Sequence, residues 1–198
     1  MVWWIWLARR FLANAEYTSP RFIHDMAFST TFFTSRFSIF TFEYTKPEVM
    51  CTIEFPCEPE GQVYSELLRF VAQRCREFRF ITYDRRPPTR KTQTITAGLS
   101  GRIIAQQLVN EWPGTQLDTE SWARLWRFRS DVSLAKDLIA VSSGFASWGG
   151  DLPEDPHFVR EDGSVMLAST SSEEDAWLML TADEYKDFAV VPAFEGLA

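Results

Sequence analysis

Histidine and cysteine are scarce in this chain of 198 residues. It contains two histidines, His24 and His157, and three cysteines, Cys51, Cys57 and Cys75. A secreted disulfide scaffold usually has a denser, even-numbered set of cysteines, and a zinc site needs further ligands at short spacing. We therefore expect free thiols in a reducing cytoplasm, no bound metal and no cofactor.

The motifs of the common catalytic sites are also absent. The sequence has no glycine-rich phosphate loop, no GxSxG, no HExxH and no CxxC. A Ser-His-Asp or Cys-His system would depend on His24 or His157, and nothing near His157 resembles an activated nucleophile. We expect no catalytic residue, so the leading interpretation is a protein that is not an enzyme.

Long apolar runs are missing as well. Residues 2–8 are strongly apolar but end at Arg9 and Arg10, whereas a membrane-spanning helix needs about 20 apolar residues. In a secretory signal peptide the positive charges precede the apolar run, and here they follow it. Residues 1–27 are interpreted as an aromatic helical segment that packs on a core. A membrane-surface or dimer contact is the alternative for this segment. Of these two, the expected partners include a possible homodimer and no membrane.

Acidic residues are concentrated in the last third of the chain. Residues 1–130 carry 17 Lys and Arg against 13 Asp and Glu, a balance of +4. Residues 131–198 carry 3 against 14, a balance of −11, and include Trp148, Trp177 and Tyr185, which is typical of a folded segment rather than an acidic tail. A folded acidic surface favours docking to a basic partner. The net charge of −7 argues against a general nucleic-acid binder.

The hydrophobic pattern predicts an α+β fold: one domain over residues 28–198, with a mainly antiparallel sheet and several helices packed on it. Residues 28–55 are strand-like, with a hairpin formed by 37–44 and 49–55, and residues 79–84 form a short strand. Helices are expected over residues 63–78, 100–112, 122–128 and 131–141, with a basic loop over 85–91.

The last third returns to strands. An Asp-Gly turn at residues 161–163 joins two predicted strands, 157–160 and 164–168, and residues 175–180 alternate as a further strand. Thr181 and Glu184 then have the spacing of a capping box, which predicts a short helix through Phe188.

The turns of this acidic region supply the candidate residues for partner contact. They lie between residues 148 and 162 and between 173 and 177, where carboxylates accompany two tryptophans. The set is Trp148, Asp151, Glu154, Asp155, Glu161, Asp162, Glu173, Glu174, Asp175 and Trp177. Clustered carboxylates also bind Mg²⁺ or Ca²⁺, but their spacing here does not match a calcium loop, so we expect no metal ligand among them.

Three stretches of the chain resemble bacterial immunity proteins of polymorphic-toxin and type VI secretion systems, in the α+β group paired with restriction-endonuclease-like toxins. They are FRFITYD at residues 78–84, FVREDGSVML at 158–167 and EEDAWLMLT at 173–181, within a resemblance that spans residues 28–190. The resemblance implies a cytoplasmic antidote that binds its cognate nuclease toxin. It assigns a role to no individual residue.

These observations give one leading hypothesis and two alternatives. The leading hypothesis is an immunity protein that neutralises a cognate, basic, nuclease-like toxin by stoichiometric binding. The alternatives are a metal-dependent enzyme with an unrecognised carboxylate site and a self-associating structural or adaptor protein.

Overall fold

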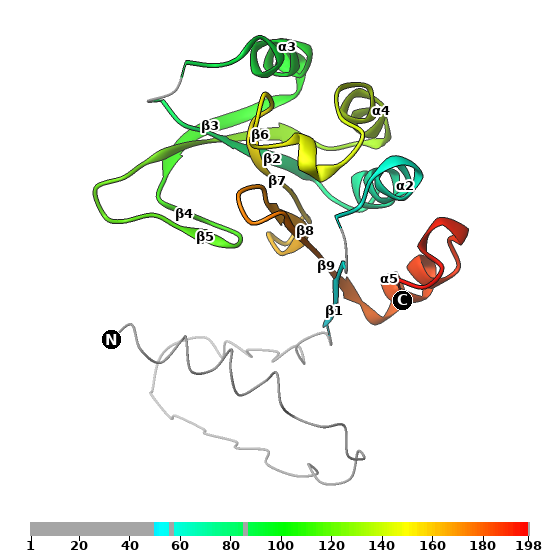
Figure 1. Ribbon diagram of the computed structural model, residues 1–198. Helices are drawn as coiled ribbons and strands as arrows, with labels where there is room; N and C mark the ends of the chain where they lie inside the picture. Colours follow the sequence, from blue (N-terminus) through cyan, green and yellow to red (C-terminus); the bar gives the residue numbers. More distant parts are fainter. Residues whose placement is uncertain (1–49, 56–57, 85–86, 198) are drawn as a thin grey trace, which may run out of the picture. The chain divides into compact units, whose positions relative to one another are not determined.

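A seven-stranded, mainly antiparallel sheet with four α-helices forms the part of the chain that the computed structural model describes, residues 50–55, 58–84 and 87–197 (Figure 1). This is the α+β fold that the sequence predicts. The strand order is β1-β9-β8-β7-β2-β6-β3, and every neighbouring pair is antiparallel. The strands are β1 (Met50–Glu54), β2 (Glu77–Thr82), β3 (Ile103–Val109), β6 (Ala123–Arg129), β7 (Glu154–Val159), β8 (Val165–Thr170) and β9 (Asp175–Thr181).

Several predictions fall on residues that lie outside the described part. These are the N-terminal segment 1–27, the strand expected over 37–44, and the residues His24 and Cys57. The strand expected over 49–55 is observed as β1, and its partner among the described residues is β9.

Three of the helices lie on one face of the sheet and enclose the main core (Figure 1). They are α2 (Gly61–Ala72), α3 (Arg90–Gly98) and α4 (Val132–Val141), while α5 (Ala182–Ala189) follows β9. The core is aromatic, since four fully buried rings form one connected group in which neighbouring centroids lie 4.9 to 6.1 Å apart: Phe78, Phe80, Phe128 and Phe158. Many of the phenylalanine side chains in the last two thirds of the chain are therefore buried in the core.

A short hairpin covers part of the opposite face. It consists of β4 (Glu111–Trp112) and β5 (Thr115–Gln116). Trp112 packs there in a second, smaller core with Ile81, Ala123 and Leu125. Gly114 at the hairpin tip has a φ of +84°, and a Cβ at this position would lie 2.7 Å from the ring of Trp177. The turn therefore requires glycine, and it covers part of Trp177.

The elements with explicit capping or turn signals are confirmed. Helix α4 begins after Asp131, whose carboxylate accepts hydrogen bonds from the backbone N–H groups of Ser133 and Leu134. The β7–β8 hairpin turns at Gly163, with a φ of +88°. Thr181 and Glu184 form the predicted capping box of α5.

Two predicted helices are wrong, because residues 100–112 and 122–128 form strands. The first contains a short 3₁₀ turn (Ser100–Arg102), β3 and β4, and the second is β6. Strand β6 is apolar on both faces: Leu125 packs in the smaller core, whereas Phe128 packs in the main one. A strand buried on both faces has no alternation, so its pattern resembles that of a helix.

A third predicted helix, over residues 63–78, is too long. Helix α2 ends at Ala72, where the backbone N–H groups of Arg74 and Cys75 both donate to the carbonyl of Val71. Phe78 already belongs to β2, although its apolar spacing continues that of the helix.

The basic loop over 85–91 is shorter than predicted because Thr89 caps α3. In the described part of the chain, no helix combines the length and apolar character needed to cross a membrane.

Candidate functional site

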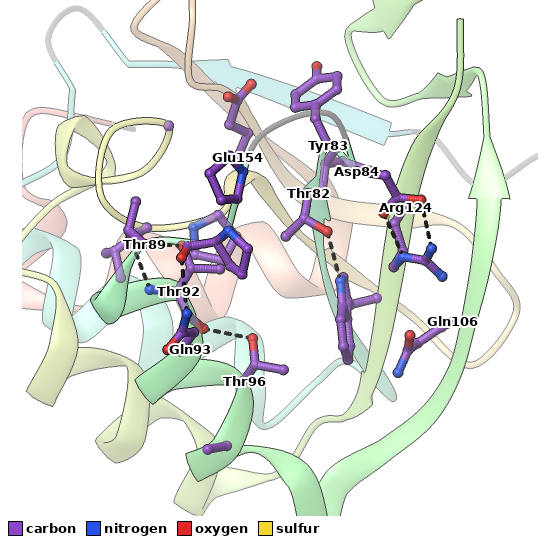
Figure 2. A pocket seen from close by; sticks show the side chains of 18 of the residues that line it. Thr82, Tyr83, Asp84, Thr89, Thr92, Gln93, Thr96, Gln106, Arg124 and Glu154 are labelled. Carbon is purple, nitrogen blue, oxygen red and sulfur yellow. Dashed lines mark hydrogen bonds and ion pairs between the residues drawn. The ribbon is translucent and has the colours of Figure 1, made fainter.

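A cavity of about 670 Å³ opens between α3 and the strands β2, β6 and β3 (Figure 2). The loop over residues 149–154 closes a further side. The volume lies in the range of pockets that hold a small ligand or a bulky side chain, roughly 300 to 1,000 Å³. Its lining includes Thr82, Asp84, Ala97, Gln106, Arg124 and Trp126.

The first turn of α3 is tied to the cavity loop. Thr89 caps the helix by accepting a hydrogen bond from the backbone N–H of Thr92, at 3.1 Å. The hydroxyl groups of Thr89 and Thr92 also donate to the backbone carbonyl of Asp151, the latter at 3.0 Å. Two walls of the cavity are therefore held together by hydrogen bonds that leave its interior open.

One side of the cavity is aromatic, and the charged side chains at its opening form an ion pair with each other. The indole N–H of Trp126 donates to the hydroxyl of Thr82 at 2.9 Å, which fixes the ring beside the sheet. Arg124 donates from Nε and Nη2 to the two carboxylate oxygens of Asp84, at 2.9 and 2.7 Å. This bidentate pairing lowers the pKa of Asp84 and raises that of Arg124. Because these charges are already paired, the cavity suits an apolar or aromatic group better than an ion.

Six carboxylates lie on the segments that meet where β1 stops and β9 begins. We call them the acidic end cluster: Glu54, Glu58, Glu60, Glu173, Glu174 and Asp175. Burial, and next the carboxylates of Glu174 and Glu60, raise the pKa of Glu58. No ion pair between described residues includes any of the six. Within the described residues, the cluster is thus a concentration of negative charge that no Lys or Arg side chain neutralises through an ion pair.

The acidic end cluster adjoins the cavity loop. Gly149 in that loop has a φ of +88°, and a Cβ there would lie 2.7 Å from the Cβ of Ser171, at the start of the β8–β9 turn. Asp155, just after the loop, accepts a hydrogen bond from the Ser171 N–H at 2.7 Å. The Asp155 N–H donates in return to the Ser171 hydroxyl at 2.9 Å. The turn that carries Glu173, Glu174 and Asp175 is therefore fastened to the cavity wall.

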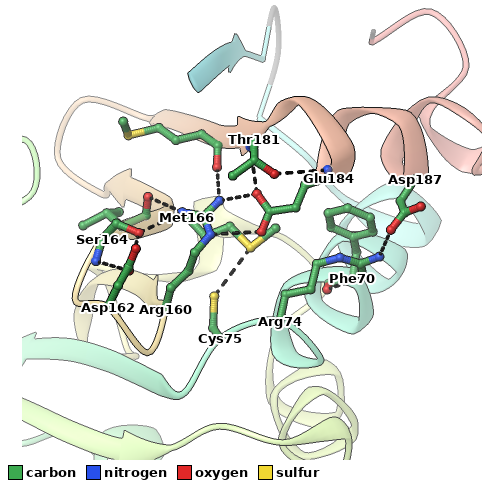
Figure 3. A network of polar contacts seen from close by, with 12 residues as sticks. Phe70, Arg74, Cys75, Arg160, Asp162, Ser164, Met166, Thr181, Glu184 and Asp187 are labelled. Atoms are coloured by element: carbon green, nitrogen blue, oxygen red, sulfur yellow. Dashed lines mark hydrogen bonds and ion pairs between the residues drawn. The ribbon is translucent and has the colours of Figure 1, made fainter. Parts of the chain in front are cut away.

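The acidic residues predicted as one contact surface lie at two opposite ends of the sheet. The turn with Glu161 and Asp162 stands at one end of β8, and the turn with Glu173 stands at the other. Six residues of strand separate the two turns, which corresponds to about 20 Å. Asp162 accepts hydrogen bonds from the N–H and hydroxyl of Ser164 (Figure 3). Glu161 is exposed and lies 3.3 Å from Arg76.

Two of the predicted contact residues are buried and serve the fold. Trp148 is only 3% exposed, and its indole N–H donates to the hydroxyl of Tyr64 at 3.1 Å. Asp155 is also 3% exposed and accepts a hydrogen bond from the indole N–H of Trp112 at 2.7 Å. Buried polar groups need such partners, and these side chains do not reach the surface. This corrects the expectation that both contact a partner directly.

Most of the other predicted residues lie at the cavity or in the acidic end cluster, and Trp177 lies in neither. Asp151 is exposed at the cavity loop, 3.0 Å from Lys91. Glu154 is half-buried and lines the cavity (Figure 2). Trp177 is half-buried in β9, beside the tip of the β4–β5 hairpin. Glu173, Glu174 and Asp175 are exposed in the cluster itself.

Two described residues that could carry nucleophilic or acid–base chemistry, His157 and Cys75, are enclosed, whereas the free thiol of Cys51 is exposed. His157 is buried, and desolvation lowers its pKa to about 4, so the imidazole is neutral at physiological pH. Burial raises the pKa of the Cys75 thiol to about 12, and its Sγ lies 3.6 Å from the sulfur of Met166. Among the described residues, no three His, Cys, Asp or Glu side chains are grouped so that they could share a metal ion.

The sequence does not predict the cavity, because its pattern gives no signal for α3 and predicts helices where β3 and β6 lie. The basic loop was the only local signal, and it contributes Pro87 and Pro88 to the lining.

Compared with models of protein families, with curated proteins and with solved structures, the chain matches none of them.

Proposed function

We propose that this protein is a cytoplasmic immunity protein that binds a basic, nuclease-like toxin in a stoichiometric complex and neutralises it. The observation that carries the proposal is the junction of the cavity with the acidic end cluster at one end of the sheet. Protein interfaces commonly combine a pocket for an anchoring side chain with charges around it. The resemblance of residues 78–84, 158–167 and 173–181 to immunity proteins supports the same function.

The acidic end cluster would act before contact. Six carboxylates without ion pairs among the described residues create a local negative field, which raises the rate of encounter with a basic surface. The screening length in physiological salt is about 8 Å, so this steering is sensitive to ionic strength. A nucleic-acid-cleaving toxin has a basic substrate-binding surface, which is the surface that such a field attracts.

The cavity would act after contact. An apolar or aromatic side chain of the toxin that enters it would lie against Trp126 and lose its exposure to water. Because Arg124 pairs with Asp84 and Lys91 pairs with Asp151, the mouth does not demand a charged group. Burial of an anchor slows dissociation, whereas steering accelerates association.

The charge contribution is tested with two charge-reversal variants at opposite ends of the sheet. The toxin is obtained by affinity capture on the tagged full-length chain, and its association and dissociation rates are measured at low and high salt. The triple variant Glu173→Lys/Glu174→Lys/Asp175→Lys should lose about tenfold or more in association rate at low salt, with a flatter salt dependence. The double variant Glu161→Lys/Asp162→Lys, at the other end of the sheet, is the control and should stay within about twofold. An equal loss in both variants would contradict the proposed surface.

The anchor contribution is tested by filling the cavity from its exposed rim. Ala97 lies on α3, is exposed and lines the cavity, so Ala97→Trp occupies space without entering the core. We expect dissociation from the toxin to be faster by about tenfold or more, with little change in association rate. Unchanged dissociation would show that the cavity is not part of the interface.

A further inference from the structure

Strand β3 presents an unusual edge. It is the last strand of the sheet and pairs only with β6, so its outer edge carries no strand within the described residues. Natural edge strands are usually short or protected by lysine, proline or strong irregularity. β3 has seven residues, IIAQQLV, without a charge or a proline. Its single register shift falls at Ile104, near one end, and residues 105–109 pair regularly with β6.

The exposed side chains of this edge are apolar. Ile104 is 44% exposed and Leu108 is 55% exposed, which places two of the largest exposed aliphatic residues on one strand. Trp122, 53% exposed, directly precedes Ala123, which pairs with Val109 at the end of β3. Unpaired backbone groups beside exposed apolar side chains form a template for another strand.

We propose that β3 pairs with β3 of a second copy of this chain, antiparallel across a two-fold axis at Gln106, and joins two seven-stranded sheets into one. The sequence is self-complementary in this register. Ile104 stands opposite Leu108, Ala105 opposite Gln107, and Gln106 opposite its own copy. Directly opposed residues share a face of the sheet, so the exposed Ile104 and Leu108 are covered together.

A second copy fits this edge better than the basic toxin does. The strand has no charge, so it neither attracts a basic protein nor repels its own copy. The acidic end cluster belongs to β1 and the β8–β9 turn, at the opposite edge of the sheet order, and stays accessible in such a dimer. The cavity, which Gln106 lines, adjoins the β3 edge. Dimer formation is measured without toxin, so its outcome is separate from that of the binding experiments.

The oligomeric state of the full-length protein tests the proposal. Sedimentation equilibrium between about 1 and 100 µM covers the affinity expected of a small interface. We expect the wild type to have twice the 22.9 kDa mass of one chain. Leu108→Lys should give a monomer, because it buries a lysine opposite Ile104. Val132→Lys on α4, at a residue 61% exposed, is the control and should remain dimeric. A monomeric wild type, or a Leu108→Lys variant that is still dimeric, would overturn the proposal.

A cysteine at the axis tests the register. Gln106→Cys places two thiols opposite each other, within reach of a disulfide, so mild oxidation should give a covalent dimer on a non-reducing gel. Val190→Cys, at a residue 77% exposed, should not cross-link beyond the wild-type level. Equal cross-linking of both variants would refute the register.

A wild-type monomer whose β3 amides are protected from hydrogen exchange would show that this chain itself covers the edge, which also overturns the proposal.

Discussion

His157 is a single residue whose burial couples folding to pH. It is 1% exposed, and its Nδ1–H donates to the backbone carbonyl of Asp155, 2.9 Å away, because a carbonyl can only accept. Desolvation lowers the pKa of the folded imidazole from 6.5 to about 4. The imidazole thus holds the start of β7 in place in its neutral form.

Acidification should therefore weaken the fold. The unfolded chain takes up a proton at His157 below about pH 6.5, and the folded chain does so only near pH 4. The stability that the neutral imidazole contributes is present above pH 6.5 and is lost as the pH falls towards 4. The loss in free energy of unfolding should be about 3 kcal/mol.

Urea unfolding at a series of pH values from 7 to 4 measures this loss. His157→Asn keeps a donor near the position of Nδ1 but does not titrate, so its free energy of unfolding should vary less over this range. Glu77 titrates in a separate window. Hydrogen bonds from Arg127, and to a lesser extent from Arg79, outweigh its desolvation and lower its pKa from 4.5 to about 2. A His157→Asn profile as steep as that of the wild type would contradict the assignment to His157.

At the scale of elements, one arginine ties helix α5 to the sheet through several hydrogen bonds. Arg160, just after β7, donates to both carboxylate oxygens of Glu184 in α5, at 3.0 and 2.6 Å (Figure 3). It also donates to the backbone carbonyls of Met179 and Val165. The side chains of Arg160 and Glu184 are only 11% and 17% exposed, so their removal leaves polar groups without partners.

Arg160→Ala should consequently lower the free energy of unfolding by about 2 to 4 kcal/mol, because the half-buried Glu184 carboxylate loses its charged partner and keeps only the hydrogen bond from the Thr181 N–H. Thermal and urea unfolding both report this change. The control is Lys186→Ala, which removes the exposed pair with Asp183 on the same helix and should have no measurable effect. Similar losses in the two variants would mean that α5 does not depend on the Arg160 contacts.

The sequence predicts those helices and turns that begin or end at a capping or turn residue. It does not predict the elements that only tertiary packing defines. Asp131 and Thr181 mark the starts of α4 and α5 through hydrogen bonds that any helix offers at its N-terminus. β6 has no such signal and is apolar on both faces because two cores meet across it. Its identity as a strand depends on β2 and β3 beside it, which local pattern does not reveal.

At the scale of the whole molecule, the charge asymmetry of the sequence becomes a cluster at one end of the sheet. Glu173, Glu174 and Asp175 were predicted as contact residues, whereas Glu54, Glu58 and Glu60 come from before residue 131 and join them only through the pairing of β1 with β9. Glu161 and Asp162 are separated from them by the length of β8. Charge counted along a sequence thus shows that acidic surface exists, and strand topology decides where it lies.

The most direct test of the proposed function is a titration of the captured toxin's activity with this protein. Cleavage of supercoiled plasmid by a fixed amount of toxin is measured at increasing amounts of the wild type or of the Glu173→Lys/Glu174→Lys/Asp175→Lys variant. The proposal predicts that activity falls linearly to zero at one equivalent of wild type, and that the variant requires a large excess. Inactivation by a small fraction of an equivalent would indicate an enzyme, and residual activity at saturation, or equal titration curves, would contradict neutralisation through the acidic end cluster.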